Sequence, residues 1–276
     1  MLFYLFKFKI MKIAIVGFGN MGKTFANGFI NARFIDLNHL YVFKRSAIDN
    51  ESLSSIPAKN IFYSLNPVLK EVDIVILAVK PQDFQSLASI LKEYISEHHI
   101  ILSVMAGVSI NKIQRFLKVD KIIRCMPNLP SQIGLGTTVL TASESIDRKD
   151  LFIVQNLINT TGKSIFVEDE KLIDAATAVS GSGPAYVFYF MQAMIEAAQK
   201  MGFSEAEAEL LVKQTFVGAI QLYSNNAIST KTWIEKVASK GGTTEVALNY
   251  FEEVSIKQKI KNGVEAARIR SEQLGK

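Results

Sequence analysis

The sequence predicts an α/β fold, with a doubly wound parallel sheet in its N-terminal half and an all-helical C-terminal half. Two observations predict it. From residue 12 to about 167, short apolar runs alternate with segments of helical periodicity. After Val167 the strand-like runs stop and helical patterns dominate. We therefore expect an N-terminal α/β domain over residues 1–166 and a C-terminal helical domain over residues 167–276.

Six apolar runs, most of them rich in β-branched residues, predict the strands: Lys12–Val16, Leu40–Phe43, Asp73–Val79, Ile100–Val104, Ile122–Met126 and a late strand at Thr137–Thr141. The third run is apolar almost throughout, which is typical of a central parallel strand covered by helices on both faces. After the first run, Phe25, Ala26, Phe29 and Ile30 recur at a spacing that suits a helix packed on the sheet.

Helix signals are clear in the C-terminal half. Pro184 suits the first position of a helix, which should end at Gly202. Ser204 and Glu207 form the capping-box pattern that begins the next helix. The segment 185–198 is apolar nearly all round, so we expect a helix that is buried on every side. A domain of this size can hardly enclose such a helix alone, and we infer that a second subunit covers it.

Composition excludes several function classes. The chain has 276 residues, 49% of them hydrophobic and 21% charged, which excludes disorder and suits two globular domains. A net charge of +5 without a run of like charges gives little support to nucleic-acid binding. One cysteine and three histidines without ligand spacing predict no metal site. Cys125 is expected to be a buried strand residue rather than a nucleophile.

The first ten residues, MLFYLFKFKI, are too short for a secretory signal and run directly into a strand. They are interpreted as a short leader or as a misassigned start, with Met11 as the functional beginning. The longest other apolar run, residues 185–198, contains Gln192 and Glu196 and is shorter than the roughly 20 residues that span a bilayer. We therefore expect a cytoplasmic protein without a membrane partner.

A dinucleotide site is predicted at Gly17-Phe18-Gly19-Asn20-Met21-Gly22, which fits G-x-G-x-x-G between a strand and a helix. In this Rossmann-type motif, Gly17 permits the tight turn, Gly19 the approach of the pyrophosphate, and Gly22 the close packing of helix on strand. The N-terminus of the helix offers its N–H groups to the phosphates.

The end of the second strand predicts the cofactor. An NAD enzyme usually places an acidic residue there to bind the ribose. This chain has Lys44, Arg45 and Ser46, two cations and a hydroxyl that would attract a 2′-phosphate. The sequence therefore favours NADPH, with NADH as the alternative.

Further cofactor contacts are expected where the other strands end, since ligands of such sheets bind outside the carboxyl ends of the strands. These residues are Ala78, Val79, Lys80, Pro81, Ala106, Met126, Pro127 and Asn128. For Lys80 three roles stay open: a catalytic acid, a phosphate contact, or a solvated loop lysine.

Two turns of small residues precede helices in the C-terminal half: Ser180–Ala185 and Ser239–Thr244. Free backbone N–H groups at a helix N-terminus suit a carboxylate ligand. In the second turn, the hydroxyls of Thr243 and Thr244 can donate to a substrate heteroatom. Helix capping alone is the alternative interpretation of both turns.

The motifs IAIVGFGNMG, AVKPQ, MPN, SGSGPAY and VASKGGTTEVALNYFE together resemble the pyrroline-5-carboxylate reductase family over nearly all of residues 12–272. The resemblance implies NAD(P)H-dependent reduction of L-1-pyrroline-5-carboxylate to L-proline, by hydride transfer to C5 of the cyclic imine. It also implies a helical domain that intertwines with its partner in a homodimer, and in this family such dimers often build pentamers.

The resemblance also assigns the substrate site. Ser239, Gly241, Gly242 and Thr243 would hold the substrate carboxylate, and Thr244, the expected catalytic residue, would hydrogen-bond the ring nitrogen. Lys240 departs from the family, which usually has proline there. A lysine loses rigidity and adds a cation beside an anionic substrate. The imine proton is expected from solvent or from a substrate that is already protonated.

Two other functions stay open at this point. A different NADP-dependent imine or β-hydroxyacid oxidoreductase would use a lysine of the helical half as its acid, with Lys200 and Lys213 as candidates by position. A non-catalytic NADP-binding regulator would keep Gly17–Gly22 but would have no reason to keep Gly241–Thr244.

Overall fold

The computed structural model describes residues 11–45 and 55–275, so the interpretation of residues 1–10 lies outside the described residues. The chain forms two compact units, one of residues up to Ser182 together with 267–276 and one of residues 183–266. The domain boundary expected at residue 166 therefore differs from the boundary between the units. The reason is that α5 (Lys171–Ala176) packs Ile173 and Ala176 against Met126 of the sheet.

The first unit contains a sheet with the order β3-β2-β1-β4-β5-β6-β7-β8 within the described residues. The strands are β1 (Ile13–Val16), β2 (Leu40–Phe43), β3 (Ile61–Phe62), β4 (Ile74–Leu77), β5 (Ile100–Ser103), β6 (Ile122–Met126), β7 (Gly136–Ala142) and β8 (Gly162–Phe166). All six predicted strands are confirmed. β3 and β8 were not predicted, because β3 has only two residues and β8 is a largely exposed edge strand without an apolar run.

The sheet is parallel except that β6 and β7 pair antiparallel. A parallel crossover needs about a dozen residues, usually with an α-helix. Only residues 127–135 connect these two strands, and they form a short 3₁₀ turn, Leu129–Ile133. The expected doubly wound parallel sheet is thus confirmed from β3 to β6, and the strand direction reverses between β6 and β7.

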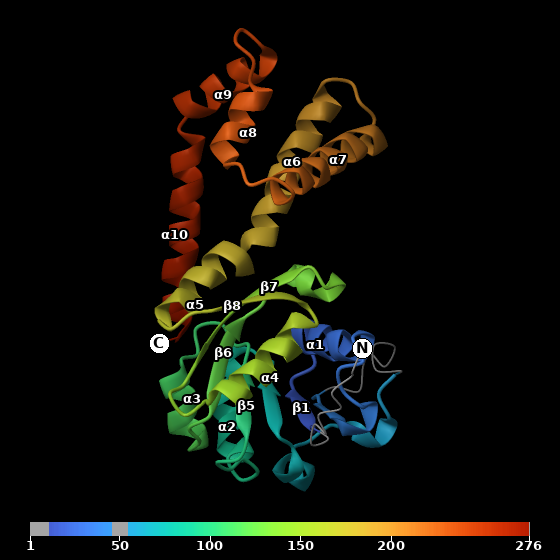
Figure 1. Cartoon of the computed structure of the whole chain (residues 1–276), viewed down its shortest axis with the longest axis vertical. Coiled ribbons are helices and arrows are strands. Elements are labelled where there is room, and N and C mark those ends of the chain that lie inside the picture. The colour runs from blue at the N-terminus through green and yellow to red at the C-terminus, as the bar shows by residue number, and fades with distance from the viewer. Residues whose placement is uncertain (1–10, 46–54, 276) are drawn as a thin grey trace, which may run out of the picture. The chain divides into compact units, whose positions relative to one another are not determined.

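Helices cover both faces of the sheet, as the apolar strands predicted (Figure 1). Side chains of α1 (Asn20–Asn31) and α4 (Arg148–Asn159) pack with Ile13 and Ile15 of β1. Side chains of α2 (Phe84–Leu91) and α3 (Ile110–Leu117) pack with Ala14 and Val16 on the other face. Successive side chains of a strand point to opposite faces, so β1 contributes to both cores.

A buried arginine joins the sheet to the C-terminus. Arg124 of β6 is 2% exposed and donates to the carboxylates of Glu170 and Asp174 at 2.9 and 3.0 Å. The hydroxyl of Ser271, in α10 (Ile256–Gly275), donates to Asp174 at 2.8 Å. The last residues of α10 therefore belong to the first unit. The neighbouring Cys125 is fully buried, as predicted, and this burial raises the pKa of its thiol and keeps it protonated.

The second unit is helical: α6 (Gly183–Lys200), α7 (Glu205–Ser224), α8 (Thr230–Val237), α9 (Thr243–Glu253) and the first part of α10. The capping box of Ser204 and Glu207 is confirmed, and Gly202 ends α6 with a φ of +104°. Within the described chain, none of the α6 residues is buried. The chain alone therefore does not bury this helix as the sequence led us to expect, because α7 covers only part of it (Figure 1).

No helix among residues 11–45 and 55–275 combines the length and apolar character needed to cross a bilayer.

Candidate active site

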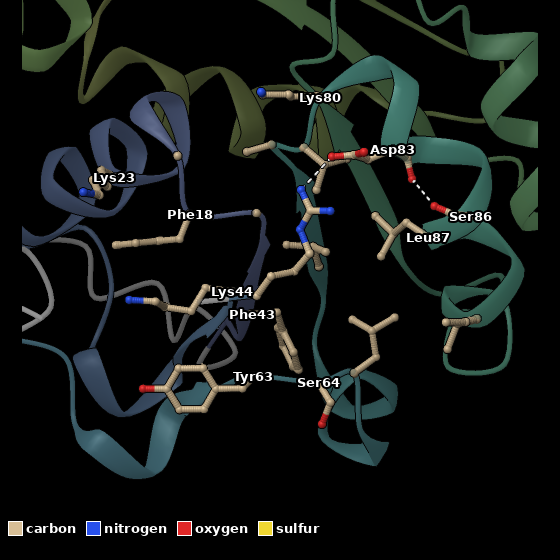
Figure 2. Close-up of a pocket in the computed structure, with 18 residues that line it drawn as sticks. Phe18, Lys23, Phe43, Lys44, Tyr63, Ser64, Lys80, Asp83, Ser86 and Leu87 are labelled. Atoms are coloured by element: carbon tan, nitrogen blue, oxygen red, sulfur yellow. Dashed lines mark hydrogen bonds and ion pairs between the residues drawn. The ribbon is translucent and has the colours of Figure 1, made fainter. Parts of the chain in front are cut away.

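A cavity of about 540 Å³ opens in the first unit where the chain leaves β1, β2 and β4 (Figure 2). This volume lies in the range of small-molecule and cofactor sites. The strand order reverses here, because β1 has β2 on one side and β4 on the other. Ligands of open α/β sheets bind at this kind of switch point.

The glycines of the first turn shape the cavity. Gly17 has a φ of +98°, and a Cβ on it would lie 2.6 Å from the carbonyl oxygen of Ala78. A Cβ on Gly22 would overlap the carbonyl oxygen of Gly17. A Cβ on Gly19 would meet nothing within 4 Å, so this residue faces open space. The turn therefore has space for a ligand at Gly19, whereas a side chain at Gly17 or Gly22 would clash with the backbone.

The beginning of α1 fits an anion. Its N-cap, Gly19, has no side chain to accept the first N–H groups, and its first turn, Asn20–Gly22, contains no acidic residue. These N–H groups have no partners within the helix. Together with the space above Gly19, they fit the pyrophosphate of a dinucleotide.

The cavity collects many of the predicted cofactor residues: Gly17, Phe18, Gly19, Lys44, Arg45, Ala78, Val79 and Lys80. Asn20, Met21 and Gly22 follow in α1, and Pro81 begins the 3₁₀ turn Pro81–Asp83 after β4. Ser46 lies outside the described residues. Lys80 is an exposed residue on the wall of this cavity.

The residues that line this cavity do not include Asn20, Met21, Gly22 or Pro81, nor four predicted cofactor residues from later strand ends: Ala106, Met126, Pro127 and Asn128. Three of these last four have structural contacts instead. Met126 packs in a small core with Val139 and Ile173, and Ala106 packs against that core. The side-chain oxygen of Asn128 accepts the N–H of Thr137 at 2.9 Å. Their role toward a cofactor stays a prediction.

Sequence reasoning missed several lining residues: Lys23, Tyr63, Ser64, Leu65, Asp83, Ser86, Leu87 and Ile90. Those numbered 63–65 follow β3, a strand too short to show periodicity. Lys23 lies one turn into α1 from Gly19, a spacing that could have revealed it.

Cations and one carboxylate border the cavity. Figure 2 shows the amino groups of Lys23 and Lys44 pointing to the same side, above and below Phe18. Arg45 instead pairs with Asp83, with 2.7 Å between guanidinium nitrogen and carboxylate oxygen. The rim is therefore cationic, as the end of the second strand predicted, but Arg45 meets an acidic partner that was not predicted.

The predicted substrate turn lies in the second unit and leads into α9. The N–H of Gly242 donates to the carbonyl of Ser239 at 3.0 Å, and a Cβ on Gly242 would lie 3.0 Å from that same oxygen. Gly241 has a φ of +74°, and its N–H donates to the carboxylate of Glu245 at 2.7 Å. Of the three N–H groups expected to hold a substrate carboxylate, those of Gly241 and Gly242 are therefore engaged within the turn, and, among the described residues, that of Thr243 is not.

The open donors of this turn lie one step further along the chain. Gly242 is the N-cap of α9 and has no side chain to accept a bond. The N–H groups of Thr243 and Thr244 have no partners within the helix. Their hydroxyls add two further groups at the same end. The N–H of Gly241 in the same turn already donates to one carboxylate, that of Glu245.

The other predicted turn divides between two elements. Ser180 and Gly181 end a π-helical segment, Thr177–Gly181, and the hydroxyl of Ser180 donates to the carbonyl of Ala176 at 3.0 Å. Gly183–Ala185 begin α6.

Comparisons with known proteins agree with both halves of the chain. A family model described as pyrroline-5-carboxylate reductase dimerisation matches residues 170–274. Another, described as NADP oxidoreductase coenzyme F420-dependent, matches residues 12–107. The chain is 32% identical to a pyrroline-5-carboxylate reductase of Arabidopsis thaliana over 95% of each sequence.

Solved structures agree as well. The crystal structure of Plasmodium falciparum pyrroline carboxylate reductase with NADP bound has a TM-score of 0.88 and 30% identity, and it covers 96% of this chain and 98% of that chain. A pyrroline-5-carboxylate reductase from Coxiella burnetii has a TM-score of 0.84 and 32% identity, over 97% of this chain and all of that chain.

Proposed function

The chain belongs to the pyrroline-5-carboxylate reductase family, and we propose that it reduces L-1-pyrroline-5-carboxylate to L-proline with NADPH, the last step of proline biosynthesis. The observation that carries this proposal is the turn before α9. Its backbone already holds a carboxylate, that of Glu245, and its threonines offer further donors. The substrate presents the same chemical group beside an imine nitrogen.

Each unit has its own task in this proposal. When bound, NADPH supplies the hydride that reduces C5 of the imine. The beginning of α1 holds the pyrophosphate, and Lys44 and Arg45 attract the 2′-phosphate. At α9, the N–H groups of Thr243 and Thr244 bind the substrate carboxylate with Ser239, and the Thr244 hydroxyl orients the ring nitrogen. A threonine hydroxyl is too weak an acid to protonate the imine alone, so solvent or a protonated substrate supplies that proton.

The proposal includes a homodimer formed through the helical unit. Large apolar side chains of α6 are 38–72% exposed in the single chain: Val187, Phe188, Tyr189, Phe190 and Met194. So many exposed large apolar side chains on one helix favour an interface there. The dimerisation model matches the region that contains them. The proposal also includes a cytoplasmic location, expected from the sequence, and pentamers of dimers, which the family resemblance implies.

An assay of NADPH oxidation with pyrroline-5-carboxylate, with proline measured as the product, tests this function. A β-hydroxyacid reductase would oxidise NADPH only with other substrates and would depend on Lys200 or Lys213. A non-catalytic regulator would bind NADPH and oxidise none. Stoichiometric formation of proline excludes both alternatives.

We expect NADPH to be preferred over NADH by about tenfold or more, because charge-assisted bonds to a phosphate each contribute on the order of 1–3 kcal/mol. The double variant Lys44→Ala/Arg45→Ala should lose most of this preference while its NADH affinity stays similar. Values of kcat/KM for both cofactors decide the matter. Equal values in the wild type, or an unchanged preference in the variant, would contradict it.

We also expect Glu245→Gln to lower the KM for the substrate about two- to fivefold, the size of a partly exposed charge interaction. The glutamine oxygen can still accept the N–H of Gly241, but the negative charge that competes with the substrate carboxylate is removed. The value of kcat should stay the same. Glu253→Gln, at the far end of α9, is the matched control. A higher KM in Glu245→Gln would mean that this carboxylate supports binding instead.

A further inference from the structure

We propose that Asp83 is a residue that sets the choice between NADPH and NADH, as the ribose-binding carboxylate that the end of β2 lacks. This proposal rests on the proposed function, since it concerns the cofactor of the same reaction. It starts from the ion pair between Arg45, which follows β2, and Asp83, which follows β4; both residues line the same cavity.

The backbone holds Asp83 in place at the end of the 3₁₀ turn after β4. Its N–H donates to the carbonyl of Lys80 at 2.9 Å, and its carbonyl accepts the hydroxyl of Ser86 at 3.0 Å. The side chain is 30% exposed, whereas that of Arg45 is 84% exposed. Asp83 is therefore the fixed partner of the pair and Arg45 the one free to move.

The position of Asp83 would suit a different task. It precedes α2, where an aspartate usually caps the first N–H groups with its side chain. Among the contacts of the described residues, the Asp83 carboxylate makes no such bond, and the backbone has helical angles instead. The carboxylate instead accepts a hydrogen bond from the Arg45 guanidinium at 2.7 Å, and Figure 2 marks the contact at Asp83 with a dashed line.

Chemistry makes this carboxylate selective. In dinucleotide sites an acidic residue accepts the hydroxyl of an unphosphorylated ribose, and it usually follows the second strand. Here that place carries Lys44 and Arg45, and Asp83 reaches the same cavity from the loop after β4. An ionised carboxylate accepts a 2′-hydroxyl but repels a 2′-phosphate.

The ion pair adds a second effect. A 2′-phosphate must either share the Arg45 guanidinium with Asp83 or break the ion pair. The attraction of Arg45 for the phosphate is therefore reduced by its interaction with Asp83. Asp83 thus weakens NADPH binding and supports NADH binding. The preference for NADPH is therefore smaller than the two cations alone would give, and the same cavity retains a use for NADH.

The test measures binding rather than turnover. Calorimetry with Asp83→Asn should give a dissociation constant for NADPH, and for its fragment 2′,5′-ADP, that is about three- to tenfold lower than in the wild type, the size expected for one partly exposed charge. The constant for NADH should rise by a similar factor. Glu93→Gln, an exposed carboxylate outside the cavity, is the matched control and should change neither constant.

The Arg45→Ala background separates the two effects. There the gain in NADPH affinity from Asp83→Asn should shrink, while the loss of NADH affinity should persist. Unchanged constants in Asp83→Asn, or constants that move in the same direction for both cofactors, overturn the proposal. Circular dichroism checks that each variant is folded. A protein that shows these shifts in dissociation constants but forms no proline would refute the proposed function and leave this inference standing. A protein that forms proline but shows no such shifts would support the proposed function and refute this inference.

Discussion

Phe188→Asp is expected to convert the protein to monomers and to lower its melting temperature. Phe188 is 58% exposed on α6 in the single chain, and its neighbours Val187 and Tyr189 are exposed as well. In a dimer formed through this helix, the new carboxylate would be buried without a partner. Such burial costs several kcal/mol, so the dissociation constant should rise about 100-fold or more.

Light scattering and sedimentation at micromolar concentration measure the assembly, and thermal unfolding measures the stability. Phe152→Asp is the matched control, because Phe152 is 62% exposed on α4 of the first unit, outside the region that matches the dimerisation model. This control should keep the wild-type mass. A wild-type protein that is a folded and active monomer at this concentration would contradict the dimer proposal.

The strands were predictable wherever burial on both faces produced an unbroken apolar run. β4, with Ile74–Leu77 at 1% exposure or less, is the clearest case. The antiparallel pairing of β6 with β7 was not predictable from such a run, because direction depends on the length and path of the connection. The burial expected for α6 was not met within a single chain, because none of its residues is buried there although its sequence is apolar nearly all round.

The cavity was predictable where its shape depends on local backbone, as at the glycine turn of Gly17 and Gly19. The cavity was not predictable where residues that follow two different strands come into contact. Nothing in the spacing between Arg45 and Asp83 indicates a contact, because the pair depends on the β2-β1-β4 strand order. In the same way, motif resemblance pointed to Ser239, Gly241, Gly242 and Thr243, whereas the turn uses the N–H groups of Gly241 and Gly242 internally.

Thr244→Ala is expected to lower kcat and kcat/KM together, by about 5- to 150-fold, which corresponds to one lost hydrogen bond of roughly 1–3 kcal/mol. The substitution removes a hydroxyl at the beginning of α9 but leaves the backbone N–H in place. If the bond to the ring nitrogen strengthens as the hydride arrives, it stabilises the transition state more than the bound substrate. Only such contacts raise kcat.

Ser239→Ala provides the contrast, because the substrate carboxylate stays charged and bound throughout the reaction. Loss of the Ser239 hydroxyl should raise the KM for the substrate and leave kcat nearly unchanged. The N–H groups of Thr243 and Thr244 would limit the increase, since both remain in this variant. Cofactor affinity, measured by fluorescence, should change little in either variant, because the dinucleotide cavity is lined by residues of the first unit alone. If Thr244→Ala retained the wild-type kcat and KM, the substrate site would have to lie away from this turn.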